Sequence, residues 1–160
     1  MNIIERAKDY VYITTPYLIL DDAMETSLKN AAKAGVDVRI ITPHIPDKKL
    51  VFEATRASYM PLMKAGVKIY EYTPGFVHAK MFVSDDKLAT VGTANLDYRS
   101  LFLHFECGAL MYRSAAVSSV KADFLETFEK CHRCSIAEMK RCSPFGKALA
   151  FVMKIIAPLL

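Results

Sequence analysis

Short apolar runs alternate with longer helical segments through the first 72 residues of the chain. The runs are rich in β-branched and aromatic residues, which is typical of buried strands, and they cover residues 10–15, 36–41 and 67–72. One helix is expected from Asp21 or Asp22 to about Ala34, ended by Gly35, and a second over 50–65, ended by Gly66. Strands that alternate with helices pair in parallel, so this pattern predicts an α/β layer fold.

The pattern changes after residue 80. Two apolar runs, 80–84 and 88–93, are separated by three residues in the spacing of a β-hairpin. A further strand is expected over 107–112, and the pattern is helical from Ser114 to the end. The sheet is therefore expected to be mixed. Because the 160 residues contain no linker, repeat or low-complexity segment, we expect one domain over 1–143, followed by an apolar helical tail over 144–160.

Composition and cysteine spacing exclude several classes of protein. Apolar residues make up 52% of the chain and charged residues 24%, which is a globular composition. The net charge of +4 is a weak basic bias, and no basic stripe with interleaved aromatics favours nucleic acid. The pair Cys131 and Cys134 lacks the partner pair of a structural zinc site, so these residues, Cys107 and Cys142 are expected to be free thiols. No secretory signal opens the sequence, which favours a reducing, cytosol-facing location.

One pattern of polar residues carries chemistry: His78-x-Lys80, then Asp85, then Gly92-Thr93-x-Asn95. On an extended chain His78 and Lys80 project to the same side, and the hairpin turn folds Thr93 and Asn95 back beside them. A neutral imidazole is a competent nucleophile toward phosphorus. An ammonium group and an amide N–H neutralise the non-bridging oxygens of a phosphodiester, so the set needs no metal and no cofactor.

This stretch resembles the HKD motif region of the phospholipase D superfamily, most closely that of bacterial cardiolipin synthases: HAKMFVSDDKLATVGTANLDYRSLFLHFE. The resemblance extends through TTPYLILDDAM, AAKAGVDVRIITP and AGVKIYEYTPGFVHAK, and covers residues 4 to 112. The segment NLDYRSLFLHFE indicates the cardiolipin synthase branch of the superfamily. The resemblance implies an α/β/α sandwich whose sheet is mixed, mainly parallel and flanked by helices.

The resemblance also implies roles for individual residues. His78 is expected to be the nucleophile that forms a phosphohistidine, or else the acid that protonates the leaving alcohol. Lys80 and Asn95 hold the phosphate oxygens, and Thr93 occupies the family's Ser/Thr position beside the phosphate. Glu106 matches the acidic residue that hydrogen-bonds the far ring nitrogen of the nucleophile.

Asp85, the acidic member of the motif, lies beyond the turn, so its implied role is structural. Only one motif is present, because His44, His104 and His132 have no lysine two residues on. Related enzymes use two facing histidines. The chain is therefore either the C-terminal half of a two-motif enzyme or a single-motif protein that builds its site across a two-fold dimer.

The activity implied is transfer of a phosphatidyl group between phosphatidylglycerol molecules, with release of glycerol. The alternatives are a dimeric phosphodiesterase or nuclease, and a half-domain that is inactive alone. The partners expected are an anionic phospholipid, a second motif-bearing half and a membrane surface, with the parent protein membrane-associated. Lys147 and Lys154 share one face of the apolar tail, which is either an interfacial helix or a terminal helix packed on the protein.

Overall fold

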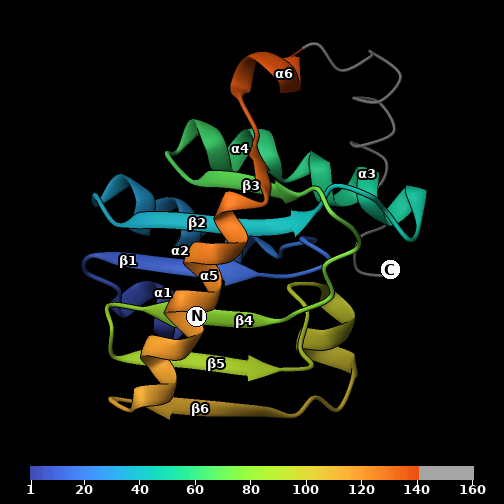
Figure 1. The fold of residues 1–160 in the computed structure, drawn as a ribbon. Helices are drawn as coiled ribbons and strands as arrows, with labels where there is room; N and C mark the ends of the chain where they lie inside the picture. Colours follow the sequence, from blue (N-terminus) through green and yellow to red (C-terminus); the bar gives the residue numbers. More distant parts are fainter. Residues whose placement is uncertain (141–160) are drawn as a thin grey trace.

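A computed structural model describes residues 1–140; Cys142, the domain boundary expected at residue 143 and the apolar tail lie outside the described residues. A seven-stranded sheet forms the centre, with the order β6-β5-β4-β1-β2-β3-β7 (Figure 1). The strands are β1 (Tyr10–Thr14), β2 (Asp37–Pro43), β3 (Lys68–Tyr72), β4 (Met81–Ser84), β5 (Leu88–Gly92), β6 (Gly108–Tyr112) and β7 (Cys131–Arg133). The helices are α1 (Asn2–Arg6), α2 (Asp22–Lys33), α3 (Lys49–Ala57), α4 (Tyr59–Lys64), α5 (Ala115–Glu129) and α6 (Ile136–Lys140), with a π-helical turn η1 (Arg99–Leu103).

The sheet is mixed, which confirms the predicted fold class. Strands β1, β2 and β3 pair in parallel through helical crossovers. Antiparallel pairs join β1 to β4, β4 to β5, β5 to β6 and β3 to β7. The expected majority of parallel pairs is wrong, because β4, β5 and β6 add antiparallel pairs on one side of β1 and β7 adds another at the opposite edge.

Helices cover both faces of the sheet. On one face α1, α2 and α4 contribute Ile4, Leu28 and Leu62 to a cluster with alternate strand residues such as Val11 and Ile13. On the other face α5 runs across the strands and packs Phe124 and Phe128 against Tyr10 and Tyr12 (Figure 1). All five residues of β1 are buried, since apolar or aromatic side chains occupy both of its faces. This is the predicted α/β/α arrangement.

The helix expected over 50–65 is two helices. α3 ends at Ala57, and α4 begins at Tyr59 after Ser58, whose hydroxyl donates to the Leu18 carbonyl at 2.9 Å. Pro61 lies in the first turn of α4, where its missing N–H costs no helical hydrogen bond. Within one continuous helix that N–H would be required, so the proline marks the break.

The continuous helix expected from Ser114 onward is also wrong. α5 ends at Glu129, and β7 follows at once, with Cys131 opposite Tyr72 at the edge of the sheet. Cys107, Cys131 and Cys134 are free thiols, as expected. Within residues 1–140, no helix has the length and apolar character needed to cross a membrane.

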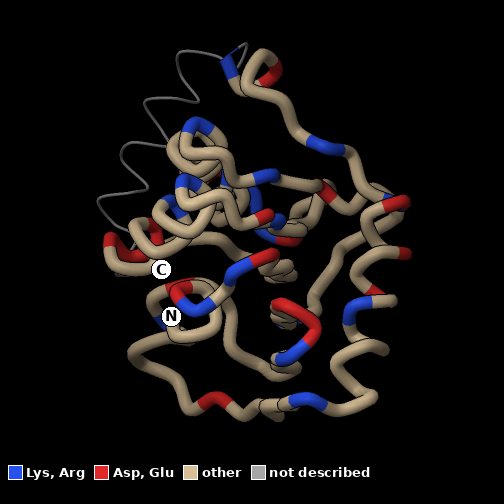
Figure 2. Tube along the Cα trace, turned by 90° about the vertical axis from the view of Figure 1, so that its left-hand side faces the viewer, with Lys and Arg blue, Asp and Glu red and all other residues tan. Residues whose placement is uncertain are grey.

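Charged residues of both signs are intermixed along the described part of the chain (Figure 2). Several of them form ion pairs with neighbours in space, for example Lys68 with Asp37 and Lys121 with Asp86.

Candidate active site

The pairing of β4 with β5 brings the two parts of the polar motif together at one end of these strands. His78 and Lys80 precede β4 rather than lying within it, but the Gly92 N–H still donates to the Lys80 carbonyl at 3.1 Å. The Thr93 N–H then donates to the carbonyl of Cys107 at 2.9 Å, next to Glu106. Three segments, the one before β4, the one after β5 and the one before β6, therefore converge here.

The His78 and Lys80 side chains are in direct contact. The Lys80 Nζ lies 2.9 Å from His78 Nδ1 and also donates to the His78 carbonyl at 2.6 Å. Because an ammonium group only donates, Nδ1 accepts, and a neutral ring then carries its proton on Nε2. The His78 side chain is exposed, and its ring lies 5.6 Å from that of Phe76, a neighbour that the motif alone did not indicate.

Lys80 also lies beside two carboxylates. Burial lowers the pKa of Lys80, and the charges of Glu106 and Asp97 raise it without reversing that effect. Lys80 and Glu106 line a cavity of about 280 Å³ whose other walls are mostly uncharged, apolar residues in and next to β4, β5 and β6. The ammonium group is thus partly shielded from water, which strengthens its attraction for an anionic ligand.

Glu106 contacts Thr93 rather than the histidine ring. The Thr93 hydroxyl donates to Glu106 Oε2, and the same hydroxyl oxygen accepts the Cys107 N–H at 3.0 Å. Hydrogen bonds from Thr93 and Ser100 lower the pKa of Glu106; burial opposes them, while His104 and Lys80 add to the lowering. In this state the single hydroxyl hydrogen of Thr93 is used to hold Glu106, so Thr93 positions a carboxylate.

Gly92 permits the close approach that sets this contact. A Cβ at Gly92 would lie 2.7 Å from the Cys107 carbonyl oxygen and 2.9 Å from the Gly108 Cα. Both are backbone atoms that cannot turn aside. The glycine therefore fixes the spacing between β5 and β6 immediately before Thr93.

Asn95 is held in place by the end of β1. The Leu96 N–H donates to the buried Thr15 hydroxyl at 3.1 Å, and the Ile19 N–H donates to the Leu96 carbonyl at 2.8 Å. Asn95 Oδ1 is buried and has no hydrogen-bond partner within residues 1–140. Sequence analysis missed Thr15, although a hydroxyl residue directly after an apolar strand and before Pro16 is a usable signal.

The structure does not bring Asp85 to this cluster. Asp85 follows β4 at the end opposite His78, in a turn where Asp85 and Asp86 have φ of 52° and 56°. Its carboxylate accepts the N–H groups of Lys8, Asp9 and Tyr10 at 2.8 to 3.0 Å. Burial raises the pKa of Asp85, but these three bonds outweigh it and hold the pKa below its ordinary value.

Comparison with known proteins identifies the family. Residues 1–128 match the family model described as the cardiolipin synthase, PLD-like domain. The chain belongs to this family. This PLD-like domain is 51% identical over 160 residues to an uncharacterized protein of Streptococcus mutans. It is 38% identical over 159 residues to a protein of Halalkalibacterium halodurans named cardiolipin synthase.

The PLD-like domain is one part of those relatives. The whole chain corresponds to 35% of the Streptococcus mutans protein, and 99% of it to 32% of the Halalkalibacterium halodurans protein. The chain therefore spans about a third of the length of the curated relatives that it matches.

Two solved structures share the fold. The phospholipase D family member Nuc of Salmonella typhimurium superposes with a TM-score of 0.72 at 16% identity, over 83% of this chain and 86% of Nuc. Phosphatidylserine synthase of Haemophilus influenzae superposes with a TM-score of 0.80 at 14% identity, over 99% of this chain but 43% of the synthase. At these identities the likeness shows the fold alone.

Proposed function

We propose that this domain supplies one half of a phosphatidyltransferase site that joins two phosphatidylglycerol molecules and releases glycerol. The observation that carries the proposal is the contact between His78 Nδ1 and Lys80 Nζ, in a domain of the cardiolipin synthase family. A histidine beside a partly buried ammonium group suits attack on, or departure from, a phosphodiester phosphorus. The second histidine that this chemistry needs comes from another motif-bearing half.

The reaction runs in two balanced steps. In the first, one histidine nitrogen forms a bond to phosphorus, the bond from phosphorus to the glycerol oxygen breaks, and the facing histidine gives that oxygen a proton. In the second, the hydroxyl of another phosphatidylglycerol attacks, its proton passes to the facing histidine, and the phosphorus–nitrogen bond breaks. His78 takes one of these two histidine roles.

Lys80 couples substrate binding to the state of the His78 ring. The ammonium group contacts Nδ1, so the ring proton of a neutral His78 resides on Nε2. A phosphate oxygen is a stronger partner for Lys80 than an imidazole lone pair is, because it carries charge. Binding of substrate draws Lys80 away from Nδ1 and leaves both ring nitrogens available for proton exchange.

The partner half is proposed to dock on an exposed apolar segment, Phe102, Leu103 and Phe105. Phe105 is fully exposed, at 107%, although aromatic side chains are normally buried where they can be. The segment leads directly into Glu106, which belongs to the site, so a second half that brings a histidine toward His78 covers this segment. Burial of this apolar segment against the second half is more favourable than its exposure to water.

The test uses the full-length protein in vesicles that contain phosphatidylglycerol. We expect cardiolipin and glycerol to form, a phosphatidylated histidine to be recovered after rapid denaturation at neutral pH, which preserves the phosphorus–nitrogen bond, and both products to be lost in His78→Ala. His132→Ala, at an exposed histidine in β7, is the matched control and is expected to retain activity. Full activity in His78→Ala would overturn the proposal, as would nuclease activity without lipid transfer.

A further inference from the structure

A second cavity, separate from the one beside Lys80, lies behind Asn95. It encloses about 280 Å³ between η1, the segment that follows β1 and the beginning of α3. This volume is near the lower limit of small-molecule sites, which begin at about 300 Å³. The cavity therefore has room for a headgroup and not for a whole lipid.

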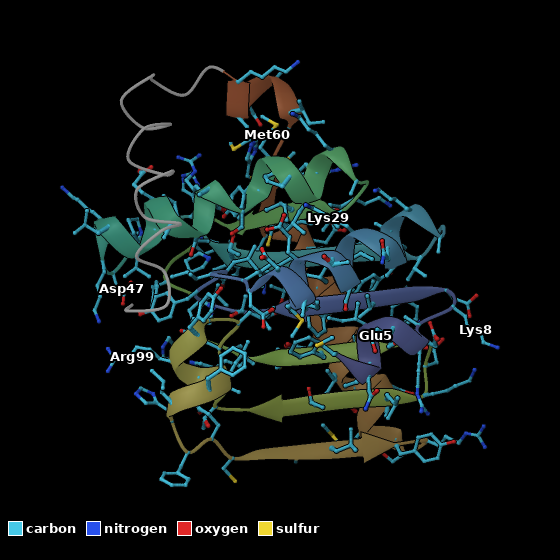
Figure 3. The ribbon with its side chains drawn as sticks, turned by 180° about the vertical axis from the view of Figure 1, so that it is seen from behind. Glu5, Lys8, Lys29, Asp47, Met60 and Arg99 are labelled. Atoms are coloured by element: carbon cyan, nitrogen blue, oxygen red, sulfur yellow. The ribbon has the colours of Figure 1, made fainter. Side chains whose placement is uncertain are left out.

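Two cationic side chains and a histidine line this cavity. Lys48 directly precedes α3, Arg99 begins η1, and His104 directly follows η1. Figure 3 shows Arg99 and Asp47, the neighbour of Lys48, at the same edge of the molecule. Within residues 1–140, neither Lys48 nor Arg99 forms an ion pair with a carboxylate.

The acidic groups at the cavity are already engaged. Asp97 is the carboxylate in the described lining, and its Oδ1 accepts the Ser100 N–H at 2.7 Å. Asp47, next to Lys48, accepts the Tyr17 hydroxyl at 2.5 Å. Burial and this bond to Asp47 raise the pKa of Tyr17 to about 12, so the phenol stays neutral. The described lining of the cavity thus sets two positive charges, Lys48 and Arg99, against the single carboxylate of Asp97.

Asn95 connects the cavity to the His78 cluster. Its Oδ1 is a buried acceptor without a partner in the described part of the chain, and such an atom is costly unless a ligand donates to it. Asp97 acts electrostatically on Lys80, and Ser100 and His104 act on Glu106. Ser100 lines this cavity and Glu106 lines the one beside Lys80, so the hydrogen bond between these two residues joins the two sites.

We propose that this cavity binds the phosphoglycerol headgroup of the acceptor lipid, with Lys48, Arg99 and His104 around its phosphate and Asn95 Oδ1 accepting a hydrogen bond from its glycerol hydroxyl. The inference rests on the proposed function. It gives the two lipids separate phosphate sites: the donor phosphate lies at His78 and Lys80, and the acceptor phosphate lies one glycerol length away. Such a site selects an anionic glycerol lipid over water and small neutral alcohols, which have no phosphate to place there.

The test compares two acceptors that share one donor step. Full-length protein is supplied with phosphatidylglycerol vesicles containing ethanol, and cardiolipin and phosphatidylethanol are measured together. Lys48→Ala and Arg99→Ala are each expected to lower cardiolipin formation about tenfold, the effect of losing one charge-assisted hydrogen bond, and to leave phosphatidylethanol formation unchanged. Lys49→Ala, which removes the next lysine along the chain and lies outside the cavity lining, is the matched control and is expected to change neither product.

A soluble probe checks the site without a substitution. sn-Glycerol 1-phosphate is expected to inhibit cardiolipin formation and to spare phosphatidylethanol formation, and Arg99→Ala is expected to abolish this inhibition. Inorganic phosphate at the same concentration, which has no glycerol hydroxyl for Asn95, is expected to inhibit less. Equal inhibition by the two probes would overturn the assignment of a phosphoglycerol site.

The remaining outcomes separate the two proposals. If both variants make cardiolipin at the wild-type rate, or lose both products equally, the acceptor site is wrong and the proposed function stands. If the wild-type protein makes neither lipid product, the proposed function is wrong and the acceptor site falls with it.

Discussion

The hydroxyl of Thr93 donates its hydrogen to Glu106 across the junction of β5 and β6. This bond is the largest of the effects that lower the pKa of Glu106. It therefore keeps the carboxylate charged as the pH falls. Sequence resemblance places Thr93 beside the phosphate and Glu106 beside the histidine. In the structure each of them is instead the other's partner, and Glu106 lines the same cavity as Lys80.

Replacing Thr93 by valine should raise the pKa of Glu106, because the first cause of its lowering is removed. The acid limb of the kcat/KM profile should then move to higher pH, and kcat should fall about tenfold or more from misplacement of the carboxylate. Thr93→Ser keeps the hydroxyl and should retain the wild-type profile. An acid limb at the same pH in Thr93→Val and in the wild type would contradict the role given to this bond.

Gly92→Ala should destabilise the protein by about 1 to 3 kcal/mol, since the new methyl group meets backbone atoms of Cys107 and Gly108 that must shift. Activity should fall as well, because Thr93 follows directly. Gly108→Ala is the matched control: its Cβ would meet Val91 and Gly92 at 3.5 and 3.6 Å, which is ordinary contact. Thermal melts that show equal losses for the two variants would refute this explanation.

Asp85→Asn should destabilise the protein by about 1 to 3 kcal/mol at neutral pH, because a charged acceptor of three N–H groups is lost. The folded-state pKa of Asp85 is lowered, so its stabilisation is complete above the ordinary value of 3.8 and is lost as the pH falls through the lower folded value. The difference between wild type and variant in denaturant midpoint should therefore vanish in acid.

Asp86→Asn is the control for that experiment. Asparagine tolerates the positive φ of both turn positions, so neither variant strains the backbone. Asp86 is 61% exposed in its ion pair with Lys121, and its loss should cost less than that of Asp85. A larger loss from Asp86→Asn would contradict the assignment of Asp85 as the anchor.

Lys80→Met should abolish turnover without lowering the melting temperature at neutral pH. Burial lowers the folded-state pKa of Lys80, so holding this residue protonated costs folding free energy at every pH below that pKa. Methionine keeps the stem and removes the charge. A melting temperature more than about 2 °C below that of the wild type would show instead that Lys80 stabilises the fold.

Phe105→Ser should leave the melting temperature of the isolated domain unchanged, since the side chain is fully exposed there. In the full-length protein the same change should lower activity about tenfold or more, as expected for an aromatic residue at the centre of an interface. Leu125→Ser, at a half-exposed leucine of α5, should change neither quantity. Wild-type activity in Phe105→Ser would exclude the exposed apolar segment as the docking surface.

Local patterns were sufficient to predict most elements of the fold. The apolar runs, Asp21 at the beginning of α2 and Gly35 and Gly66 after the helices all act on their immediate neighbours. Strand β7 was missed because its three residues gain stability from β3, which lies about 60 residues earlier in the chain and leaves no trace in the local pattern. The split of α3 from α4 was visible in Pro61 and could have been predicted.

The contacts of the candidate site also divide into those that local sequence predicts and those that depend on long-range geometry. The contact between His78 and Lys80 follows from two residues on one side of an extended segment, so the sequence predicts it directly. The bond between Thr93 and Glu106 depends on the register of β5 against β6, and Thr15 reaches Leu96 across 81 residues. Long-range geometry of this kind appears only when the sheet has been assembled.

The turn that carries Asp85 has a consequence for the order in which the domain folds. Its three hydrogen bonds reach residues 75 to 77 positions earlier in the chain, whereas the hairpin itself closes over three residues. Closing the small loop costs far less conformational entropy than closing the large one. The hairpin is therefore expected to close before β4 docks beside β1, and the Asp85 turn is expected to gain its three hydrogen bonds only at that later step.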